Sequence, residues 1–258
     1  MISVRDVSHA YNGDELILKG ITFDIEANEK VVLLGTNGCG KSTLLKILNG
    51  LISPRTGRFD YGGEPVTPAK LKDSAFNRRF RSEVVLLFQN PDAMLFNPTV
   101  FDEIAFGLRQ LGIDSVDERV NRWAAEFDLT RYLDRAPFQL SRGEKQKVCL
   151  ASLLAIEPKV LLLDEPTANL DPRSTGWLVD YLHNIEMTTV ITTHNLGMAS
   201  ELCDRTMVLS ESHELIYDGR IDDLLGDTDK LIAANLVHVH KHKHGDVEHR
   251  HYHIHDWE

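Results

Sequence analysis

A glycine-rich turn between a short apolar run and a segment of helical periodicity constrains this chain more than any other feature. Residues 30–34 read KVVLL, and GTNGCGKST follows directly. This spacing fits G-x-x-x-x-G-K-[S/T], in which glycines turn backbone N–H groups inward around phosphate oxygens and the next helix offers its positive end. In this pattern the lysine, Lys41, reaches the β- and γ-phosphates of a nucleotide, and the hydroxyl of Ser42 ligates Mg²⁺. The predicted phosphate-binding loop comprises Gly35, Thr36, Asn37, Gly38, Cys39, Gly40, Lys41, Ser42 and Thr43.

Short apolar runs alternate with helical segments along the rest of the chain. This alternation predicts an α/β protein with a largely parallel sheet. A helix after the loop is expected to stop at Asn49-Gly50, because both residues tolerate a left-handed C-cap. The expected strands cover 30–35, 83–89, 159–165 and 188–194, and the expected helices cover 41–50, 99–112 and 174–185.

The strand VLLLDEP carries a second group of functional residues. Asp164 at its end is suited to hold Mg²⁺ through the water shell of the ion, and Glu165 to take a proton from an attacking water. An Asp-Glu pair after a strand is usually only part of a loop. In this chain the pair is a more specific signal, because it follows a predicted nucleotide-binding loop in an α/β protein.

The segment LSRGEKQKV lies between these two motifs. Ser141 and Glu144 predict the capping box of a helix, which already explains both residues structurally. With this segment the sequence resembles the ATP-binding-cassette ATPases, whose signature is L-S-G-G-Q. The resemblance implies a cassette with a RecA-like core, a helical signature subdomain and a small antiparallel β-subdomain. It also implies that Ser141 and Gly143 bind the γ-phosphate of ATP held by a second cassette subunit, with a homodimer favoured.

Further positions match the same family over Ser3–Gly226. The resemblance implies that Tyr11 stacks on adenine, that Gln89 senses Mg²⁺ and the attacking water, and that His194 contacts the γ-phosphate. The implied cofactors are ATP and Mg²⁺, and Glu165, His194, Gln89 and Lys41 form the implied catalytic set. Two positions depart from the signature, since Arg142 replaces its first glycine and Glu144 its glutamine.

The stretch after Gln89, QNPDAMLFNPTV, is similar to the ATPase subunits of energy-coupling-factor importers. That resemblance implies two membrane-embedded partners, a coupling subunit and a substrate-binding subunit, with Phe96 and Pro98 near the groove that receives the membrane partner. No apolar stretch of this chain approaches the roughly 20 residues of a bilayer-spanning helix. We therefore expect a soluble chain that lies peripherally on the cytoplasmic face of the cell membrane.

Eight of the twelve histidines alternate with other residues near the C-terminus. Strand periodicity would place each run on one face, and folding at Gly245-Asp246 is expected to pair His244 with His249 and His238 with His255. Imidazole is a good ligand for Ni²⁺, Co²⁺ and Zn²⁺. The alternatives are a disordered solvated tail and an expression tag, although a tag would be consecutive histidines. The candidate ligands are His238, His240, His242, His244, His249, His251, His253 and His255.

Together these features predict a cassette domain over 1–226 and a histidine-rich metal-binding tail over 227–258. The function expected is an ATPase that energises nickel or cobalt uptake. A vitamin importer and a soluble cassette ATPase of cofactor-cluster assembly stay open as alternatives, as does a metal-storage protein with an idle cassette. A nucleic-acid partner is disfavoured by the formal net charge of −11.

Overall fold

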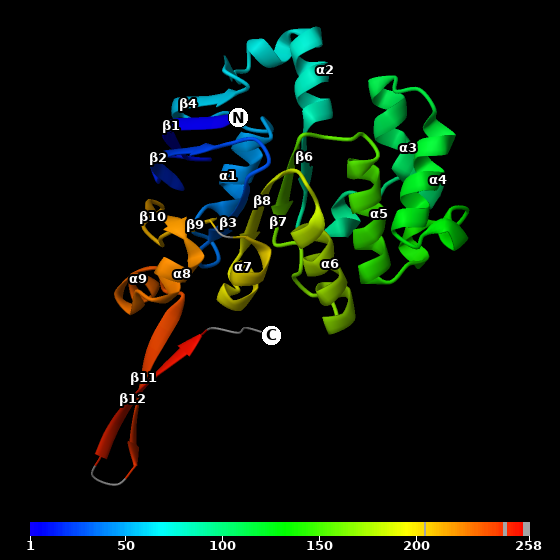
Figure 1. Ribbon diagram of the computed structural model, residues 1–258. Coiled ribbons are helices and arrows are strands. Elements are labelled where there is room, and N and C mark those ends of the chain that lie inside the picture. Colours follow the sequence, from blue (N-terminus) through cyan, green and yellow to red (C-terminus); the bar gives the residue numbers. More distant parts are fainter. Residues whose placement is uncertain (204, 245–246, 255–258) are drawn as a thin grey trace. The chain divides into compact units, whose positions relative to one another are not determined.

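The computed structural model describes residues 1–203, 205–244 and 247–254, and side chains only as far as residue 237 (Figure 1). The chain forms two compact units. Unit 1 comprises Met1–Thr67 and Val190–Glu258, and unit 2 comprises Pro68–Thr189. Within the part of the chain that the structure describes, no helix is both long and apolar enough to cross a bilayer.

Unit 1 contains an antiparallel sheet with the strand order β2-β1-β4-β5. Ile2 pairs with Ile25 and Val4 with Phe23 in the β1–β2 register. Buried and exposed residues alternate along β2, as expected where one face of an antiparallel sheet packs on a core. The strands are β1 (Ile2–His9), β2 (Leu18–Ile25), β4 (Thr56–Tyr61) and β5 (Glu64–Pro65).

A second group of strands has the order β10-β9-β3-β8 and belongs to unit 1, except for the first two residues of β8. β3 runs parallel to β9, and β9 runs antiparallel to β10. Nearly all residues of β3 and every residue of β8 are buried, which is typical of strands covered on both faces. The strands are β3 (Lys30–Leu34), β8 (Thr188–Thr193), β9 (Arg205–Leu209) and β10 (Leu215–Arg220); the helices are α1 (Lys41–Leu48), α7 (Leu196–Leu202), α8 (Ile221–Leu225) and α9 (Thr228–Ala233).

Unit 2 joins a parallel strand pair to a group of packed helices. β6 pairs with β7 in a register that sets Leu87 opposite Leu163. Helices α3, α4 and α5 pack against one another and lie side by side in Figure 1. The elements are η1 (Lys70–Lys72), α2 (Ser74–Glu83), β6 (Val84–Leu87), η2 (Pro91–Ala93), α3 (Val100–Leu111), α4 (Val116–Glu126), η3 (Thr130–Tyr132), η4 (Pro137–Gln139), α5 (Arg142–Leu154), β7 (Val160–Asp164) and α6 (Pro172–Asn184).

Most local expectations from the sequence are confirmed. The four expected strands are β3, β6, β7 and β8, and the three expected helices are α1, α3 and α6. Asn49 caps α1, and Gly50 follows with a left-handed φ of 65°. The capping box of Ser141 and Glu144 is complete at the start of α5.

Two strands, β11 (Val237–His244) and β12 (Val247–Ile254), form an antiparallel hairpin near the C-terminus (Figure 1). Its register corrects the expected pairing: His244 lies opposite Val247 rather than His249, and His238 lies opposite His253 rather than His255. Only two residues separate the strands, whereas the expected pairing requires four. His255 lies outside the described residues. The boundary expected at residue 226 stays a prediction, and α9 follows it directly.

Candidate functional site

The predicted phosphate-binding loop connects β3 to α1 in unit 1. A Cβ atom on Gly35 would lie 2.6 Å from Leu209 O, and one on Gly40 would lie 2.5 Å from Ile17 O. The φ angles at these glycines are 153° and 115°. Because both the space and the backbone conformation exclude a side chain, only glycine fits either position.

Lys41, the first residue of α1, turns its ammonium group back into the loop. Its Nζ donates hydrogen bonds to Gly35 O at 2.6 Å and to Thr36 O at 3.1 Å, and the residue is only 6% exposed. A buried ammonium group at the N-terminus of a helix is suited to bind polyphosphate. The ammonium group and the helix end are both positive, and polyphosphate is negative.

Tyr11 lies beside the same helix. Its hydroxyl is 3.3 Å from Thr43 Oγ1, and its ring meets the buried His9 ring edge-to-face at 5.0 Å. Tyr11 is nevertheless 49% exposed. The structure thus brings the predicted adenine-stacking residue next to the phosphate-binding loop, with ring surface open to a ligand.

His213 is a contributor to this loop that the sequence did not indicate. Its Nδ1 lies 3.1 Å from Cys39 O, and its own carbonyl accepts the N–H of Lys19. Because a carbonyl only accepts hydrogen bonds, the contact requires the proton on Nδ1. His213 has φ 69° in the turn between β9 and β10, and no local pattern marks such a turn residue as functional.

His194 also belongs to unit 1. It follows β8, the neighbour of β3 in the strand order, and it is half-buried. The next residue, Asn195, caps α7 by accepting the N–H of Met198. His194 therefore lies in the chain between the end of a buried strand and the start of a capped helix.

The other predicted catalytic residues lie in unit 2. Asp164 ends β7, while Gln89 lies two residues beyond the end of β6. Because these strands are parallel, their carboxyl ends bring Gln89, Asp164 and Glu165 to one edge of the pair. Glu165 is buried and has a left-handed φ of 45°. Such a backbone is costly for a residue with a side chain, and residues of this kind cluster at functional sites.

Helix α5 holds both loops at this edge. Gln146 Nε2 donates to Pro166 O at 3.0 Å, directly after Glu165. Lys145 pairs with Asp92 at 2.6 Å, and Cys149 Sγ lies 3.8 Å from Pro91 O, in the loop after Gln89. Burial raises the pKa of the Cys149 thiol, so this cysteine is an inert packing group. Sequence reasoning singled out none of these three residues as a support for the site.

The signature residues form the start of α5. Ser141 is exposed, and Gly143 packs so closely on α6 that a Cβ atom there would lie 2.5 Å from Ser174 Oγ. Asp171, the cap of α6, lies beside them on the wall of a pocket of about 400 Å³. Within unit 2 the structure therefore collects Ser141, Gly143 and two helix N-termini around one cavity.

A loop before α3 carries the segment predicted to meet a membrane partner. The buried Glu103 accepts the backbone N–H groups of Phe96 and Asn97, and the Asn97 side chain at 2.9 Å. Phe96 is held 66% exposed and meets Phe106 edge-to-face at 4.9 Å. The loop and α3 therefore present an aromatic pair at the surface, one ring from each.

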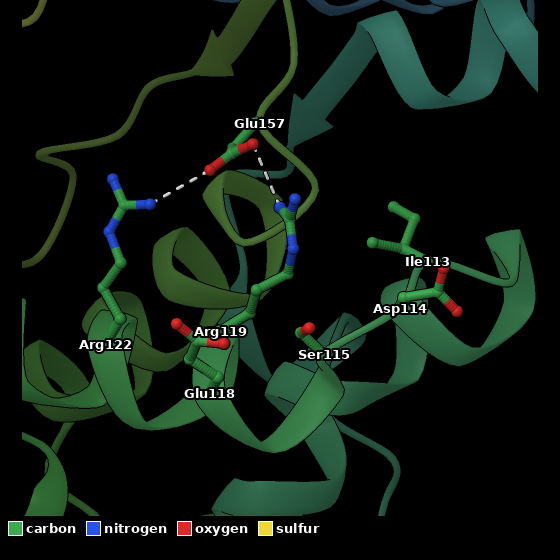
Figure 2. Close-up of a pocket in the computed structure, with 7 residues that line it drawn as sticks. All are labelled: Ile113, Asp114, Ser115, Glu118, Arg119, Arg122 and Glu157. Atoms are coloured by element: carbon green, nitrogen blue, oxygen red, sulfur yellow. Dashed lines mark hydrogen bonds and ion pairs between the residues drawn. The ribbon is translucent and has the colours of Figure 1, made fainter.

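A second pocket of unit 2, of about 390 Å³, contains none of the predicted site residues (Figure 2). Glu157 bridges Arg119 and Arg122 there, each at 3.1 Å. Because Glu157 already pairs with both guanidinium groups, we interpret the cluster as a structural ion-pair network.

The comparisons with known proteins agree with this geometry. The ABC transporter family matches residues 18–168. A protein of Methanosarcina acetivorans, provisionally named an ABC transporter ATP-binding protein, is 41% identical and covers 92% of this chain and 89% of its own length. An energy-coupling factor transporter ATP-binding protein, EcfA1 of Methanospirillum hungatei, is 35% identical, with coverages of 92% and 85%.

Solved structures support the same fold. The structure of cbiO1 from Clostridium perfringens, described as part of the ABC transporter complex cbiONQ, matches with a TM-score of 0.77, 29% identity and coverages of 91% and 94%. A dimeric ATP-binding cassette, MJ0796 bound to ADP and Pi, matches with a TM-score of 0.75, 25% identity and coverages of 86% and 99%. The expected α/β cassette with parallel core strands and an antiparallel β-subdomain is confirmed.

Proposed function

The chain belongs to the ABC transporter family, and on that premise we propose that it is the motor of an energy-coupling-factor importer for nickel or cobalt. It is an ATPase of the type that is coupled to transport. The observation that carries the metal assignment is the histidine hairpin attached to this cassette.

The energy-coupling-factor assignment rests on two independent supports. A 35% identical relative bears that name over 92% of this chain. Phe96, on the loop that the buried Glu103 fixes, also meets Phe106 of α3 at the surface. An exposed aromatic pair between a fixed loop and a helix is suited to dock an apolar helix of a membrane subunit.

We assign roles in ATP binding and hydrolysis to the following residues. Lys41 and the loop amides bind the β- and γ-phosphates of ATP, with Tyr11 stacked on adenine. Glu165 takes a proton from the attacking water, while Gln89 and His194 orient that water and the γ-phosphate. Ser141 and Gly143 bind the γ-phosphate held by a second copy of this chain, which makes the working form a homodimer on the cytoplasmic face of the membrane.

The donors available for a cation fit magnesium. The hydroxyl of Ser42, the carboxylate of Asp164 and the amide oxygen of Gln89 are hard oxygen ligands, which Mg²⁺ prefers to nitrogen or sulfur. Bound Mg²⁺ would neutralise charge on the β- and γ-phosphates. Ser42 and Asp164 would hold the ion, and Gln89 would sense it.

The hairpin supports a transition-metal cargo. Its register makes backbone partners of His238 and His253, His240 and His251, and His242 and His249. Directly opposed residues of an antiparallel pair share a face, so these six positions lie on one face of the hairpin. Nitrogen ligands of this kind suit Ni²⁺ and Co²⁺. We propose that residues 227–258 bind the same metal that the importer brings in.

The deciding experiment measures Mn, Fe, Co, Ni, Cu and Zn in cells carrying wild type or Glu165→Gln. That substitution keeps the shape of the side chain and removes the base. Nickel or cobalt alone should fall. The control is Glu118→Gln, the same chemical change at a residue that lines the pocket of Figure 2 and is far in sequence from the predicted site residues. It should leave the content of all six metals unchanged.

Other outcomes separate the alternatives. A rise in one metal would mean export. No change in any metal would reject a metal importer and favour a vitamin importer, which vitamin-dependent growth of the same strains would reveal. A soluble complex that copurifies with no membrane subunit would favour cofactor-cluster assembly instead.

The role of the tail needs its own test. Titration of the full-length chain with Ni²⁺ should show binding that disappears when the eight alternating histidines are changed to asparagine. ATP binding should be the same in both proteins. Equal Ni²⁺ binding by the two proteins would reject the tail as the metal site without touching the ATPase assignment.

A further inference from the structure

We infer that Glu144 is an internal occupant of the signature site, whose carboxylate must leave Ser141 before the partner's ATP can bind there. This inference rests on the proposed function, in which Ser141 faces a nucleotide held by a second copy of the chain. It adds a residue that sets how much ATP is needed to close the dimer.

Both hydrogen-bond donors of Ser141 are directed at one carboxylate oxygen. Ser141 N lies 2.8 Å from Glu144 Oε2, and Ser141 Oγ lies 2.7 Å from the same atom. The hydroxyl in turn accepts the N–H of Glu144 at 3.4 Å. The donors that a phosphate oxygen would use are therefore already satisfied inside the helix turn.

The Glu144 carboxylate that occupies these donors is negatively charged. Burial disfavours its ionisation, but hydrogen bonds from Tyr132 and Ser141 outweigh that effect and lower the pKa of Glu144. A carboxylate and a phosphate are both anions, so the two compete for the same donors and repel each other at contact distance. The phosphate enters only when this side chain turns away.

The backbone of the turn has little freedom to move instead. Gly143 lies so close to Ser174 that a Cβ atom would be 2.5 Å from its hydroxyl, and Ser174 is fixed by Asp171 at 2.6 Å. The adjustment therefore falls to the Glu144 side chain, which is only half-buried.

The pocket around the turn has balanced charge. Arg131, Lys147 and Arg173 contribute three cationic groups to its lining, and Asp128, Glu144 and Asp171 contribute three acidic groups. Removal of the Glu144 charge leaves one net positive charge facing an incoming polyphosphate. Neutralisation of this residue should therefore strengthen closure rather than weaken it.

The test compares Glu144→Gln with the parent chain, both carrying Glu165→Gln to slow hydrolysis. ATP-dependent dimerisation of the full-length protein is measured by analytical ultracentrifugation across an ATP titration. Glutamine also completes a capping box, so the helix start is preserved. We expect half-maximal dimerisation at an ATP concentration at least about tenfold lower. The advantage should shrink as salt rises from about 0.05 to about 0.5 M, because salt screens the repulsion.

Controls keep the result specific. Glu118→Gln removes the same charge from the first turn of α4, outside this pocket, and should leave the ATP requirement unchanged. Glu144→Asp keeps the charge on a shorter side chain that reaches Ser141 poorly, and should fall between the parent and glutamine. ATP binding to the monomer should be equal in all variants, since the phosphate-binding loop is unaltered.

An unchanged or raised ATP requirement in Glu144→Gln, with monomer binding intact, overturns the inference and leaves the ATPase assignment standing. A gain in Glu118→Gln of the same size also overturns it, because the effect would then be one of net charge. If no variant dimerises with ATP, the homodimer of the proposed function fails and this inference fails with it.

Discussion

Gln146 and Pro166 are joined by a buried hydrogen bond of 3.0 Å across 20 residues of sequence. The donor is a side-chain amide of α5, the helix that Ser141 caps, and the acceptor is the carbonyl of the residue directly after Glu165. Because Gln146 is only 3% exposed, water cannot replace this bond. The position of Glu165 therefore depends on a residue of the signature helix.

Replacement of Gln146 by methionine keeps the side-chain length and removes the donor. The buried Pro166 carbonyl would then lack this partner, at a cost of about 1–3 kcal/mol in the free energy of unfolding. We expect a lower kcat for ATP hydrolysis with little change in KM, measured by phosphate release. Gln139→Met, at an exposed position, is the matched control. Equal kcat in the two variants would refute this support role.

His213→Asn should weaken ATP binding about three- to tenfold, because the side chain no longer reaches Cys39 O, a bond worth about 1 kcal/mol. Asparagine tolerates the left-handed backbone at this position, so the turn itself is kept. Isothermal titration of the Glu165→Gln chain with ATP measures the effect. His183→Asn, on an exposed face of α6, should bind ATP like the parent. A Kd shared by both variants would exclude His213 from the site.

Asp171 should make part of the free energy of unfolding depend on pH. Its pKa is lowered by the Ser174 hydroxyl and by the N–H groups of Ser174 and Arg173. A carboxyl with a lowered folded-state pKa stabilises the protein above its unfolded pKa of about 3.9, and this contribution is lost as the pH falls through the folded value. Asp171→Asn, an equally good cap, should flatten the loss of stability below about pH 5 in urea unfolding curves. An acid limb as steep in Asp171→Asn as in wild type would refute this contribution.

Phe96→Ala should uncouple the motor without unfolding it. Because the ring is 66% exposed, the free energy of unfolding should change by less than about 0.5 kcal/mol. The ATPase of the isolated chain should also persist. Copurification with the membrane subunits should fall about tenfold if the ring is an anchor of that interface. Phe138→Ala removes an even more exposed ring elsewhere in unit 2, and equal losses in the two variants would argue against a specific anchor.

The parts of the fold that depend on local pattern were predictable from the sequence. Fully buried strands such as β3 and β7 are short apolar runs, and the caps at Asn49 and Ser141 use residues with intrinsic preference for those positions. The contacts of His213 and Gln146 were not predictable in this way. They join segments far apart in sequence, and a lone histidine or glutamine has no periodicity that marks a long-range partner.

The hairpin register illustrates a different limit. A shift of two residues keeps every histidine on the same face, because side chains alternate with a period of two. The alternating pattern therefore predicts the face and leaves the pairing open. The number of residues between the strands sets the register, and His244 opposite Val247 leaves two.

The contacts of helix α5 have a mechanical consequence. Its contacts with the two loops, through Lys145, Gln146 and Cys149, fall within about 6 Å of helix axis, at 1.5 Å per residue. Because the backbone hydrogen bonds of a helix make it move as one body, we expect a displacement at Ser141 to shift the loop after Gln89 and the loop after Glu165 together. One helix thus couples the contact at Ser141 to both loops.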